Sequence, residues 1–80
     1  MKYRSRRSRT DIVGSILEAA NGGATKTKIM YKAFLSYAQL KEYLRVLLQN
    51  GLLEYEEGRQ DLRTTQQGLH LLQTCNNLMK

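Results

Sequence analysis

Few residues in this chain are suited to catalysis. The sequence contains one histidine, His70, and one cysteine, Cys75, while its seven acidic residues are scattered along the chain. His70 has no acidic residue near it in the sequence, and Cys75 has no neighbouring cation that would favour its thiolate. One cysteine and one histidine are too few for a four-ligand zinc site, and the six glycines form no phosphate-binding motif. We therefore expect no enzymatic activity, no metal, no cofactor and no small-molecule ligand.

The sequence is rich in lysine and arginine, whose positive charges can bind anions. The formal net charge is +6, and five of the 13 lysines and arginines lie in the first nine residues, which contain no acid. They are Lys2, Arg4, Arg6, Arg7 and Arg9. This segment has little to bury, so we expect residues 1–9 to form a flexible basic arm that binds a DNA backbone or minor groove. A solubilising tail is the alternative.

A helix, a tight turn and a second helix are expected in the middle of the chain. Thr25 is a suitable N-cap for a short helix whose apolar face holds Ile29, Met30, Ala33 and Phe34. The run Ser36-Tyr37-Ala38-Gln39 has the form of a capping box, which predicts a new helix over 36–50. That helix buries Leu40, Leu44, Leu47 and Leu48 and ends before Gly51.

A helix presented in this way can enter the major groove of duplex DNA. We expect base contacts from Ser36, Tyr37, Gln39 and Glu42, and phosphate contacts from Lys26, Lys28, Lys32, Arg45, Arg59 and the arm residues Arg4, Arg6, Arg7 and Arg9. Alternatives stay open for several of them. Gln39 either contacts a base or only completes the capping box, and the Tyr37 ring lies either in the core or outside it. The three lysines of the short helix either bind DNA or form a solvated face. Glu42 either accepts a hydrogen bond from cytosine or forms a salt bridge with Arg45.

Further elements flank this pair of helices. Ser8-Arg9-Thr10-Asp11 is a capping box that opens a first helix with Ile12, Val13, Ile16, Leu17 and Ala20 on one face. The segments 52–56 and 60–64 predict a hairpin with Tyr55 and Leu62 facing inward. This hairpin is acidic, so we expect only Arg59 to touch phosphate there. Thr64-Thr65-Gln66-Gln67 predicts a last helix. The fold class is mainly α with a small β-hairpin (α+β), in the order helix, helix, helix, hairpin, helix.

The last helix, about 66–79, has two apolar stripes. Leu69, Leu72 and Met79 form one, and Leu71, Cys75 and Leu78 form the other. The second stripe predicts a homodimer, with burial of both stripes inside one domain as the alternative. No apolar run approaches the ~18 residues that span a bilayer, so we expect no membrane partner and a cytoplasmic, nucleoid-associated protein. Residues 10–80 then form one DNA-binding domain.

The chain resembles the archaeal winged helix-turn-helix transcriptional regulators and the related archaeal winged-helix chromatin proteins. The resemblance lies in residues 24–33, in Leu35-Ser36-Tyr37-Ala38-Gln39-Leu40 with Tyr43-Leu44, in Asn50-Gly51-Leu52-Leu53-Glu54-Tyr55 and in 64–69. It implies a recognition helix from about Ser36, a wing between Leu52 and Thr64, and dimers that bind duplex DNA. We therefore predict a sequence-specific, dimeric repressor. A non-specific chromatin protein and a winged-helix module that binds proteins are the alternatives.

Overall fold

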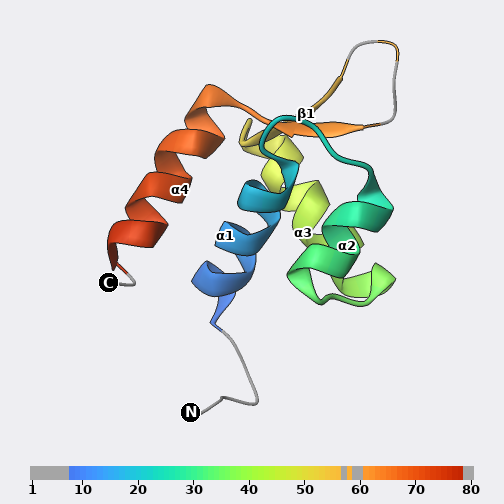
Figure 1. Ribbon diagram of the computed structural model, residues 1–80, viewed down its shortest axis with the longest axis horizontal. Coiled ribbons are helices and arrows are strands. Elements are labelled where there is room, and N and C mark those ends of the chain that lie inside the picture. The colour runs from blue at the N-terminus through green and yellow to red at the C-terminus, as the bar shows by residue number, and fades with distance from the viewer. Residues whose placement is uncertain (1–7, 57, 59–60, 79–80) are drawn as a thin grey trace.

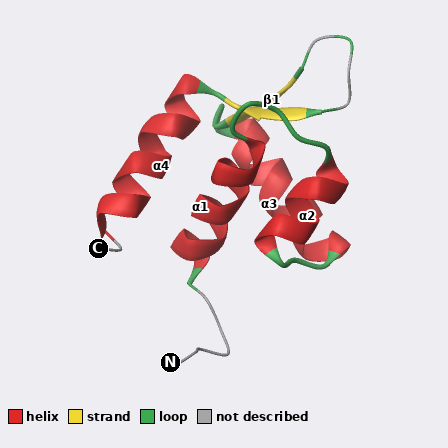
Figure 2. Ribbon diagram, viewed as in Figure 1, coloured by secondary structure: helices red, strands yellow, loops and turns green. Residues whose placement is uncertain are grey.

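The fold is four helices and one small hairpin. The computed structural model describes residues 8–56, 58 and 61–78, with side chains described up to residue 74. Its elements are α1 (Arg9–Ala20), α2 (Lys26–Ala33), α3 (Tyr37–Gln49), β1 (Leu53–Tyr55), β2 (Leu62–Thr64) and α4 (Gln66–Leu78), as Figure 1 shows. Helix is the main secondary structure, and the two strands pair antiparallel (Figure 2). The predicted fold class and the predicted order of elements are confirmed.

Side-chain caps set where the first three helices begin. Ser8 with Asp11, and Ser36 with Gln39, form complete capping boxes, and the Thr25 hydroxyl accepts the Lys28 N–H at 3.1 Å. These caps are the ones predicted. Because Arg9 is the first residue of α1, the helix begins one residue before the predicted boundary between arm and domain.

The core lies where α1, α2, α3 and the hairpin converge. Its fully buried large side chains are Ile16, Leu17, Ile29, Leu40, Leu53 and Leu62. Burying such side chains supplies most of the free energy that holds a domain of this size together. Ile12, Val13, Met30 and Leu48, also expected inside, are partly buried against this cluster.

Phe34 was predicted to lie on the buried face of α2, and that prediction is wrong. The helix ends at Ala33, and Phe34 takes the left-handed conformation, with φ 56° and ψ 51°, as its C-cap. This turn of the backbone carries the side chain off the helical face, so that 83% of Phe34 is exposed. Leu35, the next residue, is buried in its place.

The hairpin is fastened to the rest of the domain by its second strand. Leu62 exchanges backbone hydrogen bonds of 2.8 and 2.9 Å with Ala24, which lies in the loop between α1 and α2. The Thr64 hydroxyl, itself buried, donates to the Leu17 carbonyl oxygen of α1 at 2.6 Å. The hairpin therefore has a fixed position relative to α1 and α2.

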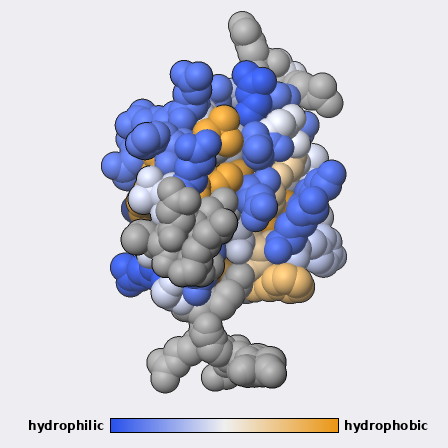
Figure 3. All heavy atoms as spheres, turned by 60° about the vertical axis from the view of Figure 1, so that its left-hand side comes forward, coloured by the Kyte–Doolittle hydropathy of each residue, from blue (hydrophilic) through white to orange (hydrophobic). Residues whose placement is uncertain are grey.

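The capping box predicted from Thr64 to Gln67 to open α4 is wrong: the N-cap is Thr65, and the residue three positions later is Gly68, which has no side chain to complete a box. The Thr64 hydroxyl is already bonded to the Leu17 carbonyl oxygen. Thr65 caps the N-terminus of α4 instead. Its hydroxyl accepts the Gly68 N–H at 3.0 Å and donates to the Gly51 carbonyl oxygen at 2.6 Å. From this start α4 packs beside α1 (Figure 1). On the face that includes α4, hydrophilic side chains surround a few hydrophobic ones (Figure 3).

Candidate nucleic-acid interface

The helix-turn-helix is built by α2, a three-residue connection and α3. Phe34 and Leu35 donate their N–H groups to Tyr31 and Met30 carbonyl oxygens, at 3.3 and 3.1 Å, which closes the C-terminus of α2. Ser36 then caps α3 immediately. The connection is short because the same few residues end one helix and begin the next.

The capping role of Gln39 is present in the structure. Its Oε1 accepts the Ser36 N–H at 3.0 Å, while the Ser36 hydroxyl accepts the Gln39 N–H at 3.2 Å. Both residues are exposed. A bidentate contact to adenine uses the amide oxygen and the amide nitrogen together. The capping box engages the amide oxygen of Gln39 and does not use its amide nitrogen.

Tyr37 lies outside the core, which answers the alternative left open for its ring. The residue is 57% exposed. The Nζ atom of Lys41, one turn farther along α3, lies 5.6 Å from the centroid of the ring. The first two turns of α3 therefore present an aromatic ring and a cation to solvent.

Glu42 and Arg45 are bonded to each other on the outward face of α3. The guanidinium donates to the carboxylate at 2.7 Å, and both side chains are mostly exposed. Of the two alternatives for Glu42, the pairing with Arg45 is present in the free protein. An exposed pair of this kind contributes little to stability, at most about 1 kcal/mol, so it affects the surface charge more than the fold.

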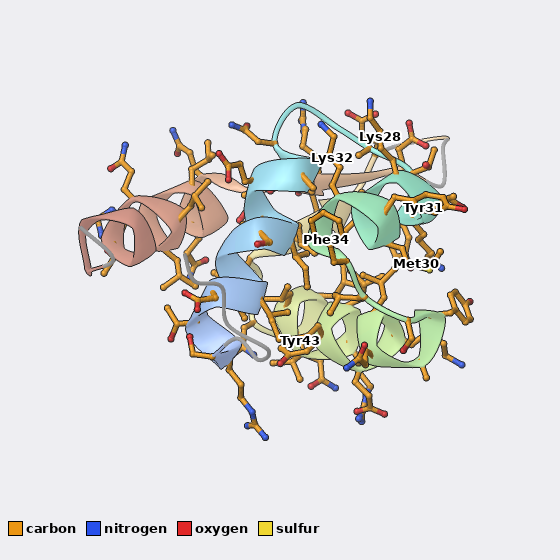
Figure 4. The ribbon with its side chains drawn as sticks, turned by 60° about the horizontal axis from the view of Figure 1, so that its bottom comes forward. Lys28, Met30, Tyr31, Lys32, Phe34 and Tyr43 are labelled. Carbon is orange, nitrogen blue, oxygen red and sulfur yellow. The ribbon has the colours of Figure 1, made fainter. Side chains whose placement is uncertain are left out.

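The three predicted lysines of α2 do not form one group. Lys28 and Lys32 are exposed and point away from the domain on the same side (Figure 4). Lys26, at the first position of α2, is partly buried, and its Nζ lies 5.8 Å from the centroid of the Tyr55 ring at the end of β1.

Tyr55 was predicted to face the core, and that prediction is wrong, since half of the residue is exposed. Alternation along the strand does place Tyr55 on the same side as the buried Leu53. The core ends before Tyr55, and the ammonium group of Lys26 lies over the ring instead. Lys41 and Tyr55 are the two residues of this surface that the sequence reasoning missed. The spacing of Lys41 from Tyr37 and Arg45, one helical turn each, was a signal for the first, whereas nothing local indicated the second.

The other flank of α3 meets the start of α1. Arg9 and Val13 line a shallow hollow together with Glu42, Tyr43 and Val46 of α3. Figure 4 shows Tyr43 between the two helices. The last arginine of the predicted arm thus lies next to the outward face of α3.

Several predicted site residues lie outside the part of the chain that the structure describes. Arg4, Arg6, Arg7 and Arg59 are outside the described residues, as are the side chains of Cys75 and Leu78. Leu71, the remaining member of the predicted dimer stripe, is half-buried. Within the described ranges, no helix is long and apolar enough to cross a membrane. Nor do three histidine, cysteine or acidic side chains gather there as a metal site would require.

Two capped helices, a tight turn and a hairpin that follows them define a class of DNA-binding domain, the winged helix-turn-helix. The chain belongs to the winged helix-turn-helix family, whose model matches residues 6–80. It is similar to a solved structure, the crystal structure of Sso10a-2, a DNA-binding protein from Sulfolobus solfataricus. The TM-score is 0.82 and the identity 24%, over 91% of this chain and 79% of that one. No curated protein matches the chain significantly. The resemblance to archaeal winged helix-turn-helix proteins is confirmed.

Proposed function

We propose that this protein is a sequence-specific transcriptional regulator that binds double-stranded DNA as a homodimer and acts as a repressor, with no enzymatic activity. The observation that carries the proposal is the solvent-facing N-terminus of α3, where Ser36, Tyr37 and Gln39 are exposed and the Nζ of Lys41 lies 5.6 Å from the centroid of the Tyr37 ring. In a helix-turn-helix, this end of the second helix reads bases while the surrounding cations hold phosphates. The similar archaeal structure, described as that of a DNA-binding protein, agrees with this proposal.

Each side of α3 has a role in the proposed complex. Lys26, Lys28 and Lys32 bind phosphates on the α2 side, and Arg45 does so farther along α3. Glu42 stays paired with Arg45 and orients its guanidinium, or turns to a cytosine amino group. Arg9 lies at the flank of α3, so the arm with Arg4, Arg6 and Arg7 starts beside the bound duplex and follows its backbone or minor groove. Arg59 contacts phosphate from the wing.

The proposed dimer forms through α4. Leu72 is buried against the domain while Leu71, about 100° away around the helix, is only half-buried. Leu71, Cys75 and Leu78 form the stripe proposed for the partner subunit. Sedimentation equilibrium of the full chain is expected to give the dimer mass, and Leu71→Gln is expected to shift it toward the monomer. A monomer at micromolar concentration for the unaltered chain would contradict the dimer.

A non-specific architectural role is the second candidate, and two contacts favour it. The amide oxygen of Gln39 is engaged with Ser36, and the carboxylate of Glu42 is engaged with Arg45. Two of the four proposed base contacts are therefore occupied within the protein, which leaves fewer groups for reading sequence than for holding phosphates. Either candidate binds chromosomal DNA, and both imply a nucleoid-associated protein in the cytoplasm.

Selection from a pool of random duplexes separates the two candidates. A regulator is expected to enrich one motif and to bind it about 10³-fold or more tighter than a shuffled duplex at the same salt concentration. An architectural protein enriches none and binds both duplexes alike. Enrichment of no duplex at all, together with no binding, would leave the winged-helix module that binds proteins.

A further inference from the structure

A shallow hollow of about 340 Å³ lies on the wing side of α3. It is bounded by Lys26 at the start of α2, Tyr55 at the end of β1, and the face of α3 that carries Lys41 and Arg45. Glu42, Leu44 and Leu48 complete its lining. Since Glu42 and Arg45 also belong to the outward face of α3, the hollow opens beside the surface proposed to enter the major groove.

The lining has an apolar floor and a cationic rim. Leu44 is buried and Leu48 half-buried, so the floor consists of hydrocarbon. Three cations and one carboxylate lie around it, and that carboxylate is bonded to Arg45. The rim therefore has an excess of positive charge.

Two of the cations form cation–π contacts with aromatic rings. The Nζ of Lys26 lies 5.8 Å from the Tyr55 ring centroid, and the Nζ of Lys41 lies 5.6 Å from that of Tyr37. Among the residues that the structure describes, neither lysine forms an ion pair. A cation over a ring keeps its full charge and its N–H donors for an anion.

We propose that this hollow seats one phosphodiester of the bound DNA backbone, which adds Lys41 and Tyr55 to the phosphate contacts. The inference rests on the proposed function. Lys26 and Lys41 bind the phosphate oxygens from two sides, the Tyr55 hydroxyl donates to one of them, and the neighbouring deoxyribose lies on the Leu48 side chain and the Tyr55 ring.

The shape of the hollow favours a polymer over a free anion. An open, solvated rim holds a single small anion weakly, because water and salt screen exposed charges. A phosphodiester of a duplex is held at neighbouring phosphates as well, so its local concentration at the hollow is high. The apolar floor suits a sugar and offers nothing to inorganic phosphate.

The test is the salt dependence of duplex binding, measured by fluorescence anisotropy for the full chain and for matched pairs of variants. Lys41→Ala is paired with Arg63→Ala, which removes a cation from the wing that lies 3.9 Å from Glu54 and from Glu56, outside the hollow. Tyr55→Phe is paired with Tyr31→Phe, which removes a hydroxyl from an exposed tyrosine of α2.

Lys41→Ala is expected to reduce the slope of log K against log salt by about 1, and Tyr55→Phe to weaken every duplex by about 3- to 10-fold at an unchanged slope. Both control variants are expected to match the unaltered chain. If Lys41→Ala and Tyr55→Phe also match it while the unaltered chain binds duplex, the phosphate seat is wrong and the proposed function stands.

A second titration shows whether the hollow binds a phosphodiester of DNA or free inorganic phosphate. Inorganic phosphate is added at constant ionic strength, and binding is followed by NMR. The shifts of residues around the hollow are expected not to saturate. Saturation by phosphate without any duplex binding would overturn both the seat for DNA and the proposed function.

Discussion

The Arg45 guanidinium and the Glu42 carboxylate are 2.7 Å apart, one helical turn from each other on the outward face of α3. The pair lies between the two hollows that flank this helix, and Glu42 lines both. A carboxylate at this place repels phosphate and competes with it for Arg45. The free protein therefore holds the charge of Arg45 in an ion pair with Glu42, and we expect this pair to weaken the contact of Arg45 with phosphate.

Replacing Glu42 by Gln tests this competition. Glu42→Gln removes one negative charge and releases Arg45, so affinity for every duplex is expected to rise by about 2- to 5-fold, with a steeper salt slope. Anisotropy titrations with mixed-sequence DNA measure both quantities. Glu54→Gln, which removes a wing carboxylate 3.9 Å from Arg63, is the control and is expected to have a smaller effect. A loss of affinity confined to the selected motif would show instead that Glu42 accepts a hydrogen bond from cytosine.

Gln39 is expected to affect both stability and sequence preference, and two substitutions separate these effects. Gln39→Ala removes the acceptor of the Ser36 N–H and is expected to lower the free energy of unfolding by about 0.5–1 kcal/mol. Gln39→Glu keeps the capping box but changes the group that faces a base. If Gln39 reads a base, both variants lose ~1–3 kcal/mol of discrimination between the selected and shuffled duplexes. Equal weakening on every duplex would mean that Gln39 only caps the helix.

The left-handed conformation of Phe34 gives a prediction about the turn itself. At φ 56° a side chain of any size is strained against its own backbone, and glycine is not. Phe34→Gly and Phe34→Ala both remove the ring, so their comparison isolates the backbone. We expect the glycine variant to be more stable than the alanine variant by about 1 kcal/mol in urea unfolding. Equal stability of the two, or a more stable alanine variant, would contradict the left-handed turn.

Gly68 is expected to be intolerant of substitution although it lies in a helix. Glycine to alanine inside a helix usually stabilises by about 1 kcal/mol. At position 68, however, a Cβ would collide with the Leu52 carbonyl oxygen and the Thr64 methyl group. Gly68→Ala is therefore expected to lower the free energy of unfolding by about 1–3 kcal/mol, through the displacement of α4 from the hairpin. Thr74→Ala, at an exposed position of the same helix, serves as the control, and a Gly68→Ala variant as stable as that control would refute the close approach.

The parts of the fold that follow from local sequence were predictable. Capping at Ser8, Thr25 and Ser36 and the leucine spacing of α3 depend on residues a few positions apart, so the helices were placed correctly. Phe34 and Tyr55 were assigned to the core because the helical repeat and the strand alternation place them on the same side as buried residues. In the structure, the core ends before either of them. Which of Thr64 and Thr65 caps α4 was settled by Leu17 and Gly51, far away in the chain. No pattern within one segment carries that information.

In the candidate site, too, some features follow from the local sequence and others depend on contacts between distant segments. The outward residues of α3 follow from the helical repeat, and the Glu42–Arg45 pair was one of the expected alternatives. The contact of Lys26 with Tyr55 joins the start of α2 to the end of β1, and only the packing of the hairpin brings them together. The position of Lys41, one helical turn from Tyr37 and from Arg45, could be read from the sequence, whereas its neighbours Lys26 and Tyr55 around the hollow follow only from the packing.

Binding of duplex DNA by this domain and its basic arm is measured by the fluorescence anisotropy of a labelled, mixed-sequence duplex of 30 base pairs, titrated with the full chain at several salt concentrations. The same titration is repeated with a chain that lacks residues 1–7, which leaves the Ser8 cap of α1 in place. We expect binding whose log K falls linearly with log salt at a slope of several, and a shallower slope without the arm. Absence of binding even at ~50 mM salt, where phosphate contacts are strongest, would show that the domain does not bind duplex DNA.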